Sequence, residues 1–521
     1  MKKNLKATVL LGLLAGTTVI YAENTAPKVV VGIVVDQLRT DYLEQLRTHF
    51  GDKGFNRLIK DGVYLQDVNF RNTVNDAPSG AAVVYTGAWP VVNGVAGKEY
   101  FDPSTLRSVP TLTDESKSVY TPANLKVSTI ADEFFITNGN LTKIYSITGD
   151  PQTGIVTAGH AGNSAVWLDD NTGKWTTSNY YGPLPPIFAN KNRVAPLSSK
   201  IGSTAWSPLH SKDYYSGSAT WHNADFRYTF AGSNKDTFSR YKSTPLFNAE
   251  VTEAAIDNLK SMQSGFLSLE YSLAPLSFDY DGDNRPELID SYVRLDNEIG
   301  RLLDSIDKEF GEGNSVVFLA STGYSHEPEI PEEAAKIPTG EITLRQVESL
   351  LNSFLSATHG NSDYVTLIKD GRIYLNKKEI ERKGINLQDI RKEVKEFLLR
   401  MSGVRDAVAI DEILRSDSPK AKDIGLGVDV KNAADIFIFF APGWTVTDDN
   451  AYPATTEKVR LASPATPAFI LAPDLLPITI NTPVEATALA PTIASVIKIR
   501  GPNAAGDRPL TLERKTHNIK K

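Results

Sequence analysis

Ser79, in the segment Asp76-Ala77-Pro78-Ser79, carries a hydroxyl of the kind that nucleophilic hydrolases use. It follows a proline at the start of a predicted helix. A serine in that place can attack a substrate when a base activates it, or it can cap the N–H groups of the first helical turn. We find no histidine in the sequence to pair with Ser79. The sequence therefore favours an N-cap, with a displaced nucleophile as the alternative.

An acidic run, Asp279-Tyr280-Asp281-Gly282-Asp283, is followed by Asp290 and has alternating carboxylates like those of a calcium-binding loop. Such loops use alternate oxygen ligands and place a glycine at the sixth position. Here the glycine stands at the fourth position. We therefore predict a solvated acidic loop over Asp279–Asp290, and keep a calcium-dependent binding protein as an alternative.

Several further segments share the layout of one enzyme family. They are the apolar run Val29–Val35 that ends in Asp36, the segment 76–87, the turn 93–97, Asp290–Asp296, Tyr374-Leu375-Asn376 and Ala490–Ala494. This layout resembles the bacterial periplasmic alkaline phosphatases of the type I phosphodiesterase/nucleotide pyrophosphatase branch of the alkaline phosphatase superfamily. The resemblance implies a threonine nucleophile that attacks phosphorus between two zinc ions.

The resemblance places Ala77 where the family has its nucleophile and Ala81 where it has a motif histidine. Of the family's zinc ligands, only Asp36 is retained. The other ligand positions fall on Pro275, Asp279, Ser321, Thr322 and Thr456. Proline has no donor atom in its side chain, and neutral hydroxyls bind zinc poorly beside carboxylate and imidazole. We therefore expect no bound metal.

The positions implied to grip phosphate have also changed. The family's Lys-x-Arg pair falls on Asp150 and Gln152, and its asparagine falls on Lys98. An acid in place of a lysine repels a phosphate dianion. Together with the lost nucleophile, these changes predict a catalytically inactive relative with a binding or scaffolding role. The alternative is a phosphomonoesterase or phosphodiesterase with an altered, zinc-dependent site.

Composition and charge limit the partners. The chain of 521 residues has a formal charge of −7, of which the first 22 residues contribute +3, so the remainder carries about −10. This balance argues against nucleic acid or an anionic membrane as partner. Residues 1–22 have a lysine-rich start, a short apolar stretch and Ala22, the pattern of a signal peptide. With no cysteine and no later apolar span, we predict an exported, periplasmic protein without a transmembrane segment.

Apolar runs rich in β-branched and aromatic residues alternate with helical patterns, which predicts an α/β fold: a three-layer sandwich around a mostly parallel sheet. The predicted strands are 29–35, 143–148, 266–271, 315–320, 434–440 and 468–471. The predicted helices are 79–86, 128–135, 246–262, 287–310, 344–357, 387–401 and 486–497. Residues 23–521 would form the core, interrupted by a cap at about 150–245 and a second insertion at about 325–430.

The predicted cap is rich in aromatic residues, which are frequent at protein interfaces although most pack inside. They are Trp167, Trp175, Tyr180, Tyr181, Tyr214, Tyr215 and Trp221. His160, in Ala158-Gly159-His160, lies in a segment that resembles the family framework, and we expect it to pack or hydrogen-bond rather than bind metal. A partner would then bind through the cap or the emptied cleft; the sequence does not identify it.

Overall fold

The computed structural model describes residues 27–139, 142–215, 226–230, 236–273, 286–323, 338–415, 417–450, 454–459 and 464–515. The predicted signal peptide, Trp221, Pro275 and residues 279–283 of the acidic run lie outside these ranges. In the described part, no helix is long and apolar enough to cross a membrane.

A nine-stranded sheet forms the centre of the molecule. In spatial order its strands are β21 (Ile478–Ile480), β2 (Val63–Leu65), β20 (Ala468–Leu471), β12 (Ser315–Ser321), β1 (Val29–Asp36), β11 (Gly265–Ser272), β6 (Lys143–Thr148), β7 (Ser164–Leu168) and β8 (Trp175–Thr177). The five strands from β12 to β7 are parallel to one another, whereas β20 and β8 run antiparallel to their neighbours. The predicted mostly parallel sheet is confirmed.

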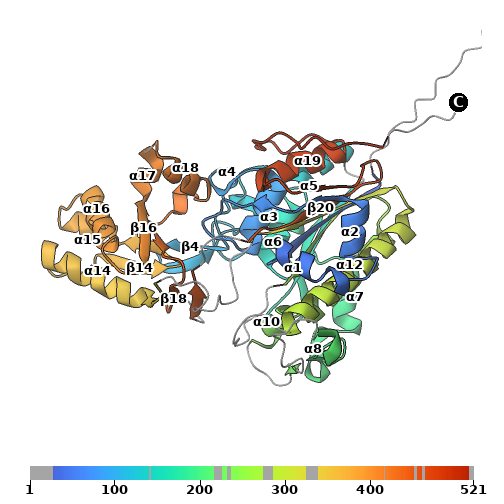
Figure 1. Ribbon diagram of the computed structural model, residues 1–521, viewed down its shortest axis with the longest axis horizontal. Coiled ribbons are helices and arrows are strands. Elements are labelled where there is room, and N and C mark those ends of the chain that lie inside the picture. Colours follow the sequence, from blue (N-terminus) through green and yellow to red (C-terminus); the bar gives the residue numbers. More distant parts are fainter. Residues whose placement is uncertain are drawn as a thin grey trace, which may run out of the picture.

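Helices cover both faces of this sheet, so the predicted three-layer α/β sandwich is also confirmed (Figure 1). Odd-numbered β1 residues such as Val31 and Ile33 pack on the face that carries α1 (Thr40–Gln45), α2 (Phe55–Asp61), α11 (Pro245–Ser261) and α12 (Pro286–Phe310). Val30 and Val34 pack on the other face, with α3 (Ala77–Thr86), α5 (Ile130–Asn138), α6 (Pro151–Ala158) and α19 (Leu489–Val496). Burial on both faces explains why β1 is almost wholly apolar.

One glycine in β1 allows α3 to pack closely on the sheet. A Cβ atom on Gly32 would lie 2.3 Å from the Tyr85 hydroxyl and 2.4 Å from the Phe318 ring. Tyr85 is fully buried and its hydroxyl donates to Ser268 Oγ at 3.1 Å. The absent side chain at position 32 therefore leaves the space that the Tyr85 ring needs under the sheet.

Residues 338–459, as far as they are described, form a second lobe to the left of the sandwich (Figure 1). Its four-stranded antiparallel sheet has the order β14 (Val365–Lys369), β15 (Arg372–Leu375), β17 (Ile436–Phe440), β16 (Val404–Ala409). A smaller sheet contains β13 (Glu341–Thr343), β18 (Thr445–Asp448) and β19 (Thr455–Lys458). The lobe's helices are α14 (Leu344–His359), α15 (Lys377–Arg382), α16 (Leu387–Leu398), α17 (Ile410–Arg415) and α18 (Pro419–Leu426).

One predicted strand lies in a different sheet from the one expected. The run 434–440 was assigned to the central sheet, but it forms β17 of the second lobe, between β15 and β16. Its apolar side chains pack in the lobe's own core with Leu351 and Val394. An apolar run buried on both faces looks the same in either sheet, which explains the error.

Ion pairs connect the second lobe to the sandwich. Lys126 Nζ lies 2.8 Å from Asp429, and Lys369 Nζ lies 3.0 Å from Glu99. Arg71 pairs with Glu485 of the sandwich at 2.6 Å and with Asp423 of the lobe.

Smaller elements on the sandwich side are β3 (Val68–Asn69), paired with β22 (Val484–Glu485), the hairpin β4 (Glu99–Asp102) and β5 (Arg107–Pro110), and α4 (Pro90–Asn93).

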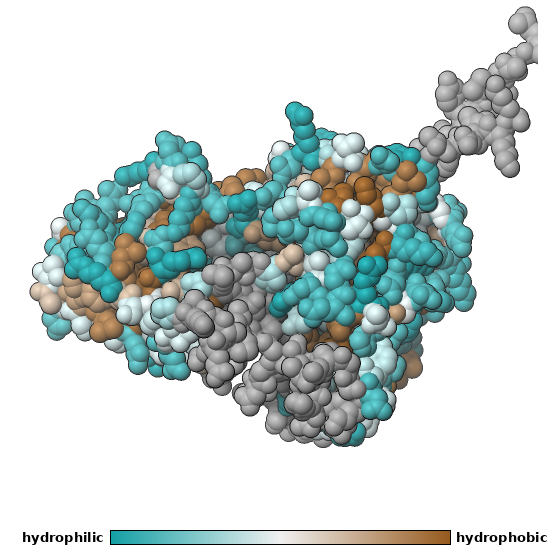
Figure 2. All heavy atoms as spheres, in the orientation of Figure 1, coloured by the Kyte–Doolittle hydropathy of each residue, from teal (hydrophilic) through white to brown (hydrophobic). Residues whose placement is uncertain are grey.

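Residues 150–245 contribute α6, β7 and β8 to the sandwich and then form short elements beside it. These are α7 (Pro186–Val194), α8 (Leu197–Lys200), β9 (Ala205–Trp206), α9 (Lys212–Tyr215), β10 (Tyr228–Thr229) and α10 (Thr237–Lys242). Trp167, Trp175 and Tyr215 are buried, whereas 47% of Tyr180 is exposed. On the face drawn in Figure 2, hydrophilic residues cover most of both lobes, with smaller hydrophobic groups between them.

Asp290 anchors these short elements to α12. It is fully buried and accepts hydrogen bonds from Trp206 Nε1 at 2.7 Å, Tyr215 Oη at 2.8 Å, the Leu209 N–H at 2.7 Å and Arg294 Nε at 2.6 Å. Both carboxylate oxygens are thus occupied by protein donors. Asp290 is a structural anchor, and this arrangement does not support the calcium-loop alternative at this residue.

We predict that Asp290→Ala lowers the free energy of unfolding by roughly 3–5 kcal/mol, because it leaves Arg294, the Leu209 N–H and the buried donors of Trp206 and Tyr215 without their acceptor. Urea denaturation followed by circular dichroism measures this change. Asp304→Ala on the same helix is the matched control, since it removes only a solvent-exposed ion pair with Lys53 and should cost less than about 1 kcal/mol. Equal losses in the two variants would contradict the anchoring role.

Candidate functional site

Helix α3 begins at the carboxyl edge of the central sheet with Ala77 as its first residue. Asp76 is the N-cap: its carboxylate accepts the Ser79 N–H at 2.9 Å, and the Ser79 hydroxyl faces the Asp76 N–H at 3.3 Å in a capping box. Ser79 is therefore the third helical residue and not the N-cap that the sequence suggested. It is fully buried, and its hydroxyl donates to the Val74 carbonyl at 2.9 Å. This contact uses the proton that a base would have to remove.

The end of β12 lies against both β1 and α3. Thr322 donates its hydroxyl to Asp36 Oδ1 at 3.0 Å, and Ser321 donates to the Leu38 carbonyl at 2.9 Å. A Cβ atom on Gly80 would lie 1.9 Å from the Thr322 carbonyl, so the first turn of α3 presses on this strand end. Asp36, Ala77, Ser321 and Thr322 are therefore brought together, as expected for carboxyl ends of parallel strands. The hydroxyl that donates to Asp36 is thus that of Thr322, at the end of β12.

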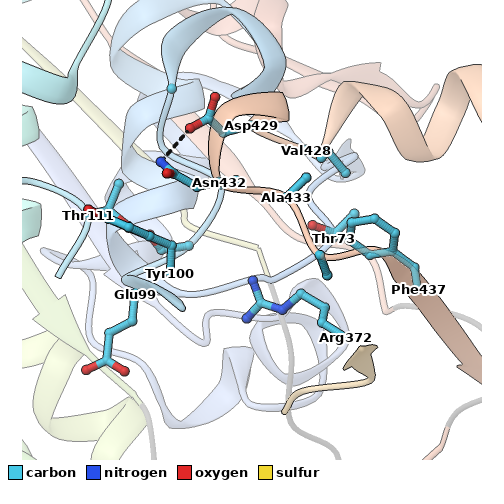
Figure 3. Close-up of a pocket in the computed structure, with 14 residues that line it drawn as sticks. Thr73, Glu99, Tyr100, Thr111, Arg372, Val428, Asp429, Asn432, Ala433 and Phe437 are labelled. Atoms are coloured by element: carbon cyan, nitrogen blue, oxygen red, sulfur yellow. Dashed lines mark hydrogen bonds between the residues drawn. The ribbon is translucent and has the colours of Figure 1, made fainter. Parts of the chain in front are cut away.

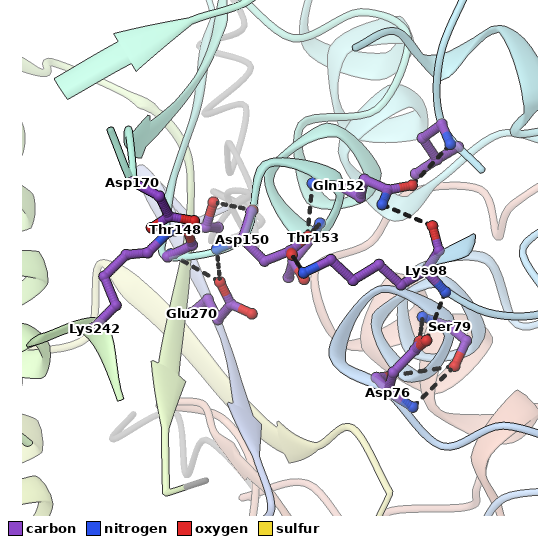
Figure 4. Close-up of polar contacts among 12 residues, drawn as sticks. Asp76, Ser79, Lys98, Thr148, Asp150, Gln152, Thr153, Asp170, Lys242 and Glu270 are labelled. Carbon is purple, nitrogen blue, oxygen red and sulfur yellow. Dashed lines mark hydrogen bonds and ion pairs between the residues drawn. The ribbon is translucent and has the colours of Figure 1, made fainter. Parts of the chain in front are cut away.

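Lys98 and Asp150 form an ion pair at this edge, with Nζ 2.6 Å from Oδ2 (Figure 4). Asp150 is also the N-cap of α6 and accepts the N–H groups of Gln152 and Thr153 at 2.8 and 3.1 Å. The charge of Asp150 raises the pKa of Lys98 above its ordinary value. Although burial opposes ionisation of Asp150, Lys98 and these N–H groups hold its pKa below the usual range. Lys98 and Asp150, at two positions where the resemblance implies phosphate contacts, thus neutralise each other's charge.

Gln152 holds two segments together rather than facing the cleft. It is almost fully buried; its Oε1 accepts the Leu112 N–H at 2.8 Å and its Nε2 donates to the Lys98 carbonyl at 2.8 Å (Figure 4). Similarly, His160 hydrogen-bonds to Asp132 at 3.1 Å and to the Leu125 carbonyl at 2.9 Å. Both side chains have structural partners.

Two charged residues at this edge were missed by the sequence reasoning. Glu270, on β11, accepts the N–H groups of Gly149 and Asp150 with one oxygen, each at 2.8 Å. Lys242 lies 2.6 Å from Asp170 and donates to the Gly149 carbonyl at 2.7 Å. A glutamate within an apolar buried strand is unusual, and this could have identified Glu270 as a candidate.

Burial makes the ionised forms of the carboxyl groups at this edge unfavourable. It raises the pKa of Asp36 to about 6, opposed in part by the Thr322 hydroxyl, and raises the pKa of Glu270 to about 8, with a further contribution from the charge of Asp150. Burial also raises the pKa of Asp76. These groups lie close to the Lys98–Asp150 pair, yet they accept hydrogen bonds from uncharged side-chain and backbone donors of the described chain.

These residues line a cleft of about 990 Å³ between the sandwich and the second lobe. Asp36, Ala77, Lys98, Asp150 and Glu270 lie on the sandwich side. The second lobe contributes its β14–β15 turn together with parts of β17, β18 and β19, including Thr456, which lies in the second lobe rather than beside Asp36. The volume is at the upper end of that of small-molecule sites. This cleft is the candidate functional site.

A second cavity, of about 30 Å³, lies at the junction of the two lobes, where the Arg372 guanidinium points toward Tyr100 and Thr111 (Figure 3). Arg372 pairs with Asp370 at 2.8 Å, and its Nε has no hydrogen-bond partner in the described chain. The space suits one or two water molecules. It is too small for an organic substrate.

The arrangement at the cleft does not fit two zinc ions. Within the described ranges, no three His, Cys, Asp or Glu side chains gather as metal ligands. Zinc sites need three or four such donors. Asp36 has the Thr322 and Gln37 side chains as partners at 3.0 and 3.3 Å. Of the substituted ligand positions, Pro275 and Asp279 lie outside the described residues.

We predict that Glu270→Gln stabilises the protein at high pH. Because the folded-state pKa is raised, the stability contributed by protonated Glu270 is full below about pH 4.5 and is lost as the pH rises toward 8. Glutamine keeps an acceptor for both N–H groups and carries no charge. Urea denaturation should show a gain of roughly 1–3 kcal/mol at pH 9 and little change at pH 4.5.

Glu309→Gln, at an exposed position of α12, is the matched control and should change stability by a few tenths of a kcal/mol at either pH. A Glu270→Gln protein that is less stable than the wild type at pH 9 would contradict the assigned environment.

Known proteins are similar to this chain in sequence and in fold. The profile of the type I phosphodiesterase/nucleotide pyrophosphatase family matches residues 30–463. A protein named calcium-transporting ATPase from Myroides odoratus is 29% identical, over 93% of this chain and 94% of its own. Alkaline phosphatase PafA from Elizabethkingia meningoseptica is 27% identical, over 96% and 98%. A crystal structure of alkaline phosphatase PafA superposes with a TM-score of 0.82 at 26% identity, over 93% and 98% of the two chains. The chain therefore belongs to the type I phosphodiesterase/nucleotide pyrophosphatase family of the alkaline phosphatase superfamily.

Proposed function

We propose that this protein is a catalytically inactive member of its family that has kept the interlobe cleft as a binding site. The observation that carries the proposal is the start of α3, where Ala77 presents a methyl group to the cleft. A methyl group cannot attack phosphorus. The neighbouring Ser79 hydroxyl is buried in the capping box and donates to the Val74 carbonyl, so it does not replace the nucleophile.

The charges of the cleft support the same proposal. A phosphate dianion at the Lys98–Asp150 position would meet an already neutralised lysine and an ionised aspartate. Asp36, Asp76 and Glu270 add further carboxyl groups around that position. Phosphoryl transfer depends on cationic stabilisation of the equatorial oxygens. The described sandwich side of the cleft, where carboxyl groups outnumber lysines, offers the opposite electrostatic environment.

A metal-dependent phosphoesterase with an altered site is the second candidate. It is favoured by the relatives named alkaline phosphatase, which cover nearly the whole chain. Fold and family alone do not fix activity, because function depends on the site. The two candidates differ in metal content and turnover, which can be measured directly.

We further propose that the protein is exported to the periplasm, on the basis of the signal-like residues 1–22.

We predict that the purified protein, prepared in zinc-containing buffer, holds well under one zinc ion per chain, because only Asp36 is kept among the ligand positions, the others being Ala77, Pro275, Asp279, Ser321, Thr322 and Thr456. Elemental analysis by mass spectrometry measures this. Alkaline phosphatase PafA purified in parallel is the control for metal loss during preparation. Two retained zinc ions would refute the inactive-family-member proposal.

We also predict that aryl phosphate monoesters and diesters are not hydrolysed above background between pH 7 and 10. The nucleophile and cationic contacts that supply on the order of 8 kcal/mol or more of barrier reduction are missing. Hydrolysis of 4-nitrophenyl phosphate and its diester measures this. If activity appears and is lost in Ser79→Ala, the displaced nucleophile is correct and the proposal is wrong.

A further inference from the structure

The two walls of the interlobe cleft differ in chemistry. The sandwich wall carries carboxyl groups at the ends of β1 and β11 and at the start of α3, whereas the second-lobe wall combines apolar side chains of β17 and its neighbours with charged and hydroxyl residues. A ligand that fills the cleft contacts both walls. Its charge and shape can therefore be inferred from them.

The sandwich wall has more carboxyl groups than counter-charges. Its two lysines are each paired with an acid, Lys98 with Asp150 and Lys242 with Asp170, both at 2.6 Å. Asp36, Asp76 and Glu270 remain. Their hydrogen bonds within the described chain come from hydroxyl, amide and backbone N–H groups, which carry no full charge. In their ionised forms these three carboxyl groups attract a positive charge placed beside them.

The second-lobe wall supplies an apolar surface. Ile438, Phe439 and Phe440 follow one another along β17, and Val446 and Val459 lie beside them. Phe439 and Phe440 line the cleft and are only partly buried. Three cations line this wall as well: Lys369 and Arg372 are paired with Glu99 and Asp370, and Arg405 is the third. Successive side chains of a strand point to opposite faces, so Phe440 shares its face of β17 with Ile438, whereas Phe439 packs on the other. A half-buried aromatic ring gains free energy when an apolar ligand covers it.

Resting on the proposed binding function, we propose that the cleft binds an organic cation with an apolar body: an amine whose ammonium group lies at Asp36 and Glu270 and whose hydrocarbon part packs on β17. Charge complementarity selects the amine end, and the partly buried phenylalanines select the apolar end. An anion of the same shape meets only repulsion at the sandwich wall. The preference is thus the reverse of that of a phosphate site.

Isothermal titration calorimetry at pH 8.5 with three ligands that share a phenyl group tests this proposal: phenethylamine, 3-phenylpropionate and phenyl phosphate. Phenethylamine should bind at least about tenfold more tightly than either anion, since each charged hydrogen bond contributes roughly 1.5–3 kcal/mol. Asp36→Asn and Glu270→Gln should each weaken the amine about fivefold or more. Phe440→Leu, which keeps an apolar residue, should weaken it less than Phe440→Ala.

Glu309→Gln is the matched control and should leave the amine affinity unchanged. Tighter binding of either anion, an amine affinity that neither carboxyl variant alters, or no amine binding at millimolar concentration would overturn the proposal. Thermal melts of each variant confirm that it is folded. Zinc content and phosphate ester hydrolysis are measured separately, so failure of the amine proposal can be distinguished from failure of the proposed inactivity.

Discussion

The buried carboxyl groups at the carboxyl edge of the central sheet are the constraint to which the rest of the site is fitted. Parallel strands β1 and β11 direct Asp36 and Glu270 to this edge, and α3 and α6 begin beside them with Asp76 and Asp150. Four carboxyl groups in one shielded place are mutually unfavourable. The structure offsets part of this cost with one lysine, with two helix N-termini and with partial neutralisation of Asp36 and Glu270.

The framework around this edge does not depend on its chemistry. Gly32 leaves space for Tyr85, and Gly80 allows the first turn of α3 to press against the end of β12. These are packing relations, and they remain whether residue 77 is a nucleophile or an alanine. The chain superposes on alkaline phosphatase PafA with a TM-score of 0.82, and a shared framework of this kind does not by itself fix the chemistry of the site.

The fold could be predicted from the sequence because its signals are local. The strands at 143–148 and 468–471 have the predicted bounds, and the long helix over 286–310 follows its periodicity closely. Sheet membership is not local, which is why β17 was assigned to the wrong sheet. The Lys98–Asp150 pair could not be predicted either, since it joins residues that are far apart in sequence. Glu270 was missed, although an acid in an apolar strand is a usable signal.

The residues at this edge are coupled, so under the proposed inactivity a single substitution would not produce a phosphatase. A hydroxyl placed at residue 77 would stand at the start of α3, but no lysine or zinc ligand would face it from α6 or β12 in the described chain. Replacing Asp150 by lysine would leave Lys98 without its partner and put two like charges about where the ion pair stands. It would also remove the N-cap of α6. The present site is therefore a self-consistent arrangement of its own, in which each changed residue makes the others tolerable.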